Sequence, residues 1–154
     1  MKVIFLDFDG VLDTAYYDSY LEQRGHPSCD EDGRPIFDPM CVGYLKRIIE
    51  KTNTKLVVSS DWKYYDSLKE LQNLWVNRQM PGRLLDITPN NKICRGAEIS
   101  EWLSKKEDIT NYVILDDLSA DNFHADQLEH LVAVNPYNGI DEVVCGRVIN
   151  ILDR

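Results

Sequence analysis

Short apolar runs alternate with longer amphipathic segments along this chain. The first run, Val3–Leu6, is continuously apolar, as strands covered on both faces of a parallel sheet are. Later segments carry apolar residues at helical spacing. The pattern predicts strands at 2–8, 55–60, 84–88, 112–116 and 131–135, helices at about 38–53, 62–79, 96–106, 122–129 and 141–152, and an irregular polar stretch at 13–37. This alternation indicates an α/β fold, a Rossmann-like, doubly wound parallel sheet that binds ligands beyond the carboxyl ends of its strands.

Composition limits the class of protein. A length of 154 residues fits a single domain spanning 1–154, and 44% hydrophobic with 28% charged residues is typical of a globular protein. No apolar stretch approaches the roughly 20 residues that span a bilayer, and the N-terminus does not resemble a secretion signal. The four cysteines form no CxxC pair, which favours reduced thiols and weighs against structural zinc. We therefore expect a cytoplasmic protein without a membrane partner.

The net charge restricts the partners further. The chain has 26 acidic and 17 basic residues and a formal charge of -9. Broad nucleic-acid binding requires many neutralised phosphates, so this charge argues against it. An anionic substrate can still bind where a divalent cation inverts the local field.

Two aspartates follow the first apolar run. Asp7 and Asp9 would point to the same side if the strand continued, and Gly10 then permits a sharp exit of the chain. A single aspartate at such a place often only caps a turn or a helix. Two carboxylates held together repel each other unless a cation or a shared proton offsets their charge, so the pair indicates a functional site.

Other strand ends carry polar residues too. Ser59 and Ser60 follow the second long strand, where either hydroxyl could cap the next helix. Asp116 and Asp117 end the fourth strand, and Asp121 follows shortly after. If these strands are neighbours, three or four carboxylates converge on one crevice. Such oxygen ligands suit a hard cation, with Mg²⁺ as the first expectation.

A phosphate handled at this crevice would also need a protein cation. Arg95 stands at the start of a predicted helix, where a positive charge is poorly placed for the helix dipole, so its position suggests another role. Lys92 and Lys63 are the competing candidates, and a solvated Arg95 on a loop is the alternative.

Together these positions resemble the haloacid dehalogenase (HAD) superfamily. The run DFDGVL at residues 7–12 is similar to its first motif, Ser59 to the second with Ser60 as the other register, Arg95 to the third, and Asp116-Asp117 to the fourth. The segments 59–63 and 95–103 resemble a narrower group, the small HAD domains that occur alone or within multi-domain RNA-repair proteins.

The resemblance implies a Mg²⁺-dependent phosphomonoester hydrolase that acts through an aspartyl-phosphate. Asp7 would be the nucleophile and Asp9 the general acid/base. The implied substrate-binding residues are Ser59, Ser60, Arg95 and Lys63, and the implied metal-binding residues are Asp7, Asp9, Asp116 and Asp117, with Asp121 as the alternative to Asp117.

The gaps between the motifs are too short for a folded cap domain, so we expect a HAD-type core with no or minimal cap. An open site would suit a bulky phosphorylated substrate. A nucleic-acid end phosphatase in repair and a non-catalytic HAD-like binding module are the alternative functions.

Overall fold

The computed structural model describes residues 1–154 and contains one five-stranded sheet in which every pairing is parallel. The strands are β1 (Lys2–Leu6), β2 (Lys55–Val58), β3 (Leu84–Ile87), β4 (Asn111–Asp116) and β5 (Leu131–Ala133). Their order is β3-β2-β1-β4-β5: β2 and β3 lie on one side of β1, and β4 and β5 lie on the other. The predicted Rossmann-like fold is confirmed, and its switch point lies between β1 and β4.

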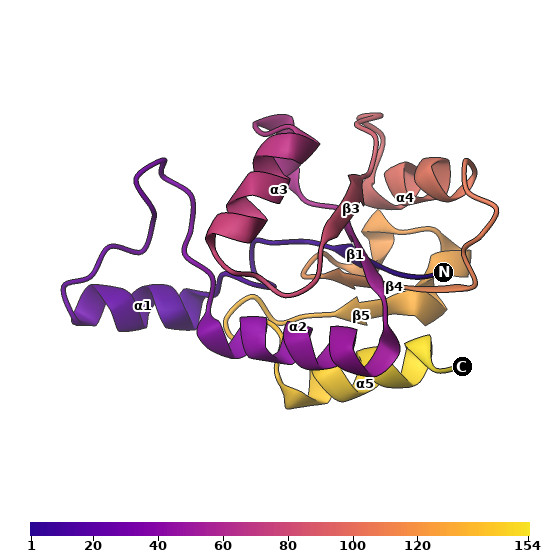
Figure 1. Cartoon of the computed structure of the whole chain (residues 1–154). Helices are drawn as coiled ribbons and strands as arrows, with labels where there is room; N and C mark the ends of the chain where they lie inside the picture. The colour runs from indigo at the N-terminus through magenta and orange to yellow at the C-terminus, as the bar shows by residue number, and fades with distance from the viewer.

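Helices cover both faces of the sheet (Figure 1). The α-helices of the chain are α1 (Ala15–Gln23), α2 (Pro39–Thr52), α3 (Leu68–Asn77), α4 (Arg95–Leu103) and α5 (Glu142–Leu152). Figure 1 shows α2 and α5 running side by side along one face, with α4 on the opposite side. None of these helices combines the length and the apolar character needed to cross a membrane.

The central strand divides its side chains between two cores. Ile4 and Leu6 pack into the larger core with residues of α2, α3 and α5, while Val3 and Phe5 pack into the smaller core beneath α4. Alternate residues of a strand point to opposite faces, so burial on both sides requires the unbroken apolar run seen in the sequence. This two-sided packing fixes the carboxyl end of β1, where the candidate site begins.

Three predicted elements differ from the structure. The stretch 13–37 contains α1, capped by the Thr14 hydroxyl, although Leu21 is its only fully buried residue. The predicted helix 62–79 is interrupted: a 3-10 helix, η1 (Asp61–Tyr64), precedes α3, which begins anew at a capping box formed by Ser67 and Glu70. In place of the helix at 122–129 there are 3-10 helices, η2 (Ala120–Asn122) and η3 (Ala125–His130).

The structure has only a minimal cap. Between β1 and α2 lie α1 and a tight turn at residues 28–36. An isolated antiparallel β-bridge between the backbones of Cys29 and Pro35 closes this turn. Between β2 and α4 lie only η1, α3 and β3. Figure 1 shows α1 and the following loop beyond the edge of the sheet where β1 ends. These segments can border the site without enclosing it.

Candidate active site

Three carboxylates meet where β1 and β4 end. Asp7 follows β1, and its backbone N–H donates to the Leu115 carbonyl at 3.0 Å, which extends the pairing of the two strands. Asp116 ends β4, and Asp117 follows it. Each of the three residues offers a carboxylate oxygen, and these oxygens lie within 4.8 Å of one another. The sheet itself therefore brings together the predicted acidic residues.

Burial makes this cluster electrostatically costly. Only 5% of Asp7 and 0% of Asp116 are exposed. Burial raises the pKa of Asp7 to about 9, and the negative charges of Asp116 and Asp117 act in the same direction, while Arg95 opposes them. Burial also raises the pKa of Asp116, again against the effect of Arg95. The cluster thus has more negative charge than its surroundings compensate.

Arg95 is the cation that reaches the cluster. Its Nη1 lies 3.0 Å from Asp116 Oδ2 and 3.7 Å from Asp7 Oδ1, and it also donates to the carbonyl of Ser59. Its Nη2 lies 3.1 Å from Asp61 Oδ1 at the outer rim. The side chain is 8% exposed, so the guanidinium spans from the buried carboxylates to the surface.

Gly96, the residue after Arg95, lets the start of α4 lie close to the carboxylate cluster. A Cβ on Gly96 would lie 2.8 Å from the Phe123 Cα and 2.9 Å from the His124 nitrogen. Real side chains do not tolerate such distances, so the residue must be glycine for α4 to pack this closely against the segment after β4. That packing holds the first turn of α4, and with it Arg95, over the carboxyl edge of the sheet.

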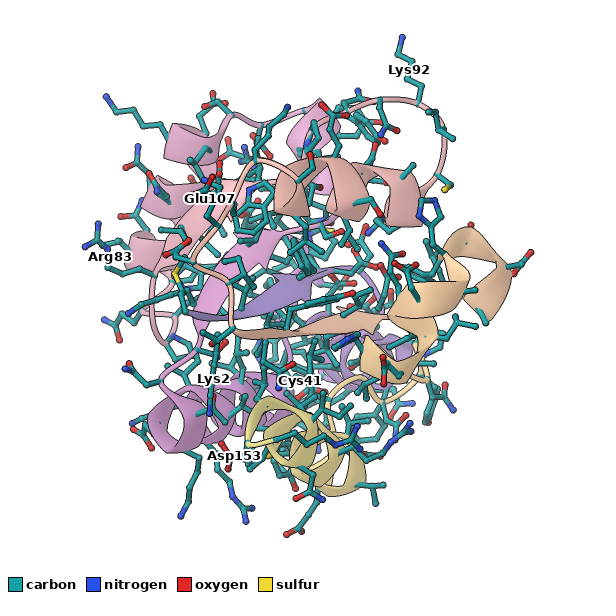
Figure 2. All side chains as sticks on the ribbon, turned by 90° about the vertical axis from the view of Figure 1, so that its right-hand side faces the viewer. Lys2, Cys41, Arg83, Lys92, Glu107 and Asp153 are labelled. Carbon is teal, nitrogen blue, oxygen red and sulfur yellow. The ribbon has the colours of Figure 1, made fainter.

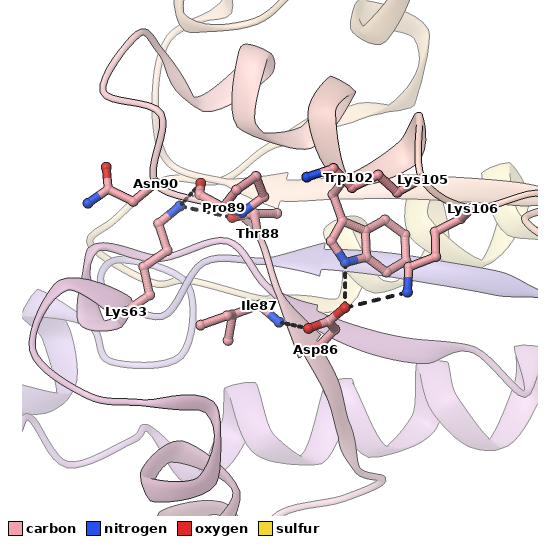
Figure 3. A pocket seen from close by; sticks show the side chains of 9 residues that line it. All are labelled: Lys63, Asp86, Ile87, Thr88, Pro89, Asn90, Trp102, Lys105 and Lys106. Carbon is pink, nitrogen blue, oxygen red and sulfur yellow. Dashed lines mark hydrogen bonds and ion pairs between the residues drawn. The ribbon is translucent and has the colours of Figure 1, made fainter.

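The two competing lysines lie elsewhere. Lys92 is exposed and points away from the molecule, as Figure 2 shows. Lys63 is 2% exposed and pairs with Glu98, which is also buried. Its Nζ also donates to the Thr88 hydroxyl at 2.9 Å and to the Pro89 carbonyl at 3.2 Å, at the side of a separate pocket (Figure 3). Neither lysine contacts the carboxylate cluster.

The two serines after β2 differ in their partners. The Ser60 hydroxyl accepts from the Trp62 N–H at 3.4 Å and caps η1. The Ser59 hydroxyl is completely buried and has no hydrogen-bond partner, while the carbonyl of the same residue accepts from Arg95. A buried hydroxyl without a partner is costly, which fits a donor that a ligand oxygen would satisfy.

Asp9 does not continue the strand beside Asp7. The strand ends at Leu6, and a turn closed by hydrogen bonds to the Phe8 carbonyl follows, so Asp9 is exposed. The Trp62 Nε1–H donates to Asp9 Oδ1 at 2.8 Å. This indole holds the carboxylate in one orientation, a role that periodicity alone could not reveal. The only signal for it was the position of Trp62 in the segment 59–63.

Asp117 and Asp121 occupy different places. Asp117 belongs to the carboxylate cluster, whereas Asp121 is exposed and accepts from the Ser119 hydroxyl. Gly10, with φ +77, makes room for Asp117, because a Cβ there would lie 2.3 Å from Asp117 Oδ2. The turn after β1 therefore needs glycine both for its backbone conformation and for this close approach.

The family comparison agrees with this arrangement. A family model described as "HAD domain in Swiss Army Knife RNA repair proteins" matches residues 3–144. The chain belongs to this family. The predicted relation to the HAD superfamily and to its small RNA-repair-associated domains is confirmed. No curated protein and no solved structure matches the chain significantly.

A HAD domain indicates a phosphatase-type hydrolase superfamily, and HAD proteins generally use Mg²⁺. The donors in this HAD domain fit that ion. In proteins, carboxylate oxygens bind Mg²⁺ at about 2.1 Å. Because the oxygens of Asp7, Asp116 and Asp117 lie within 4.8 Å of one another, small side-chain rotations would allow them to share one ion.

Proposed function

We propose that this HAD domain is a Mg²⁺-dependent phosphomonoester hydrolase that acts through an aspartyl-phosphate on Asp7. The observation that carries the proposal is the convergence of three carboxylates, two of them buried, with the Arg95 guanidinium 3.0 Å from Asp116. A buried anionic cluster with a protein cation at its rim suits a divalent metal and a phosphoryl group together. The substrate would be a phosphorylated molecule that can reach an open site.

Asp7 would supply the nucleophile. One of its carboxylate oxygens attacks phosphorus, a phosphorus–oxygen bond to Asp7 forms, and the bond to the leaving alcohol breaks. The Phe8 N–H donates to Asp7 Oδ1 at 2.8 Å and restricts the rotation of the carboxylate. A positioned nucleophile needs little further ordering on the way to the transition state.

Asp9 would transfer the protons. As an acid it protonates the oxygen of the leaving alcohol. It then takes a proton from the water that attacks the aspartyl-phosphate, which releases inorganic phosphate and restores the Asp7 carboxylate. Its exposure and its hydrogen bond from Trp62 suit this role, because the carboxyl is accessible to the leaving group yet held in one orientation.

Ser59 and Arg95 would hold the outer phosphoryl oxygens. The Ser59 hydroxyl has no partner within the protein, and the Arg95 guanidinium offers planar donors that match two oxygens of one phosphoryl group. Both would act where charge spreads over those oxygens in the transition state.

Asp7, Asp116, Asp117 and the backbone carbonyl of Asp9 would hold Mg²⁺. When bound, the ion would neutralise phosphoryl charge and make phosphorus more electrophilic. Arg95 already compensates part of the same carboxylate charge, so the protein can keep its acidic site assembled.

The test is a screen of phosphorylated metabolites, nucleotides and end-phosphorylated oligonucleotides with Mg²⁺, with excess chelator, and with Asp7→Asn. Mg²⁺-dependent phosphate release by the wild type and acid-stable labelling of Asp7 by a [³²P]-substrate would support the proposal. Phosphate release that Asp7→Asn retains at the wild-type rate would refute the role of Asp7.

Two alternatives give different results in this screen. A nucleic-acid end phosphatase, which the RNA-repair description of the family favours, would prefer the oligonucleotides. A non-catalytic binding module would bind phosphate compounds without releasing phosphate. The exposed Asp9 argues against a binding module, because binding alone does not require a proton donor at the mouth of the site.

A further inference from the structure

A second cavity opens beside Asp9, and none of the three clustered carboxylates lines it. It has a volume of about 560 Å³, and two segments form its walls. The turn after α1 contributes Asp32 and Arg34, and the segment around η1 contributes Asp61, Tyr65 and Asp66. Because Asp9 lines the cavity, a group bonded to the phosphoryl oxygen that Asp9 protonates would extend into it.

The turn is held in place by ion pairs to the opposite wall. Arg34 Nε donates to Asp66 Oδ2 at 3.1 Å, and its Nη2 bonds to the other oxygen of the same carboxylate. Arg78, the residue that follows α3, also holds the turn: it lies 2.8 Å from Asp30 Oδ2 and donates to the Pro35 carbonyl at 2.8 Å. The cavity is therefore formed before any ligand enters, which reduces the entropy lost on binding.

The lining is predominantly acidic. Its only cation is Arg34, and both sides of that guanidinium are already paired, with Asp66 and, at 3.2 Å from Nη1, with Asp32. Asp9 adds a further carboxyl group, and so does Asp61, which pairs with Arg95 at the rim of the active site. Tyr65 is 87% exposed and offers an aromatic face beside them. An anionic group here would meet carboxylates and no available donor cation, whereas a cation or a neutral hydroxyl would meet acceptors and a ring.

We infer that this cavity holds the leaving alcohol and selects phosphomonoesters whose alcohol is cationic or uncharged over those whose alcohol carries a second negative charge. The inference rests on the proposed function and narrows its substrate class. The phosphoryl group itself stays on the Arg95 side of Asp9. The next phosphate of a polynucleotide would face the acidic wall, so a phosphorylated nucleic-acid end is disfavoured relative to a mononucleotide.

The experiment uses three esters of nearly equal size: phosphoethanolamine, ethylene glycol monophosphate and phosphoglycolate. Their leaving groups carry an ammonium, a hydroxyl and a carboxylate in the same place. We expect kcat/KM to fall in that order, with at least about a tenfold difference between the first and the last. The same compounds are also measured as competitive inhibitors of p-nitrophenyl phosphate hydrolysis. Their inhibition constants then give a ratio of affinities even where their own turnover is slow. A nucleoside 3′-monophosphate is compared with the corresponding 3′-phosphorylated dinucleotide.

Two charge reversals separate the cavity from the overall charge of the protein. Asp32→Lys places a cation on the cavity wall, while Glu31→Lys makes the same change at the adjacent exposed position outside the lining. We expect Asp32→Lys to reduce or reverse the preference between phosphoethanolamine and phosphoglycolate, and Glu31→Lys to leave it within about twofold. Circular dichroism of both variants checks that the turn and the fold are intact.

The outcomes distinguish this inference from the proposed function. If neither p-nitrophenyl phosphate nor any ester of the screen releases phosphate with Mg²⁺, the proposed function fails and the inference with it. Equal or better use of phosphoglycolate or of the dinucleotide overturns the inference alone. So does an equal shift of the preference in both lysine variants, because the effect would then come from net charge and not from the cavity.

Discussion

Replacing Arg95 tests the centre of the site most directly. It is the only cation that contacts Asp7 and Asp116, and its side chain is 8% exposed. Without it, two buried carboxylates lose their only compensating charge. Breaking a buried ion pair by removing one partner costs about 3–5 kcal/mol. Because burial raises the pKa of Asp7 to about 9, that carboxyl group already holds a proton near neutral pH, and the charge left unpaired is mainly that of Asp116. We therefore expect Arg95→Ala to lower the free energy of unfolding by an amount near the lower limit, about 3 kcal/mol.

For a domain of this size, such a loss lowers the melting temperature by roughly 6–12 °C. Mg²⁺ at the same carboxylates should restore part of the loss, so the increase in melting temperature on adding Mg²⁺ should be larger for Arg95→Ala than for the wild type. Turnover measures a second quantity. Losing one preorganised donor to the transition state costs about 2–4 kcal/mol, or about 30- to 900-fold in kcat/KM.

The assay combines differential scanning fluorimetry with phosphatase kinetics for Arg95→Ala, Arg95→Lys and Lys92→Ala. Arg95→Lys should recover part of both losses, since it keeps the charge but not the planar pair of donors. Lys92→Ala is the control, because Lys92 is exposed and contacts none of the carboxylates. The reasoning is wrong if Arg95→Ala retains kcat/KM within threefold of the wild type, or if Lys92→Ala is the variant that loses activity.

Five further substitutions test the rest of the site and the buried Lys63–Glu98 pair beside it. Asp7→Asn should abolish both turnover and formation of the phosphoenzyme. Asp9→Asn should slow the hydrolysis of alkyl phosphates far more than that of p-nitrophenyl phosphate, whose leaving group needs no proton. Equal slowing of both esters would contradict the role of Asp9. Trp62→Phe keeps a ring beside Phe8 but removes the 2.8 Å hydrogen bond to Asp9. Losing about 1.5 kcal/mol with that bond should reduce kcat for alkyl phosphates by about tenfold, with no comparable loss for p-nitrophenyl phosphate. Lys63→Met leaves Glu98 unpaired and should lower the free energy of unfolding, measured by urea denaturation, by about 3–5 kcal/mol. Adding Glu98→Gln to this variant should restore part of the lost stability. A double variant no more stable than Lys63→Met would show that the loss does not come from an unpaired Glu98.

The centre of the sheet was predictable because β1, β2 and β4 are largely buried on both faces. Val3–Leu6 has no polar interruption, and such a run cannot be a surface helix. Helix α1 was not predictable in the same way, because only Leu21 is buried and no apolar stripe marks the segment. The interruption before α3 is marked by Ser67 and Glu70, whose capping box begins a new helix without changing the apolar pattern.

The site divides along similar lines. Asp7 and Asp116 could be placed together because adjacent parallel strands bring their carboxyl ends to one edge. The contact between Trp62 and Asp9 depends on the path of two turns, η1 and the turn after Phe8, which no periodicity encodes. The partner of Lys63 is Glu98, on a helix far along the chain, so the sequence could not show that its charge is already compensated.

The two buried cations, Lys63 and Arg95, differ in function because they differ in their partners. Lys63 and Glu98 form a local pair of equal and opposite charge, so neither has charge left to attract a substrate. Arg95 instead shares one positive charge among Asp7, Asp116 and Asp61, and the cluster remains negative around it. A divalent cation held by the same carboxylates would take over that compensation and leave the donors of Arg95 available to a phosphoryl group. On the proposed function, the same guanidinium would stabilise the metal-free site and bind the substrate of the metal-bound one, and the larger Mg²⁺-induced stabilisation expected for Arg95→Ala would measure this exchange.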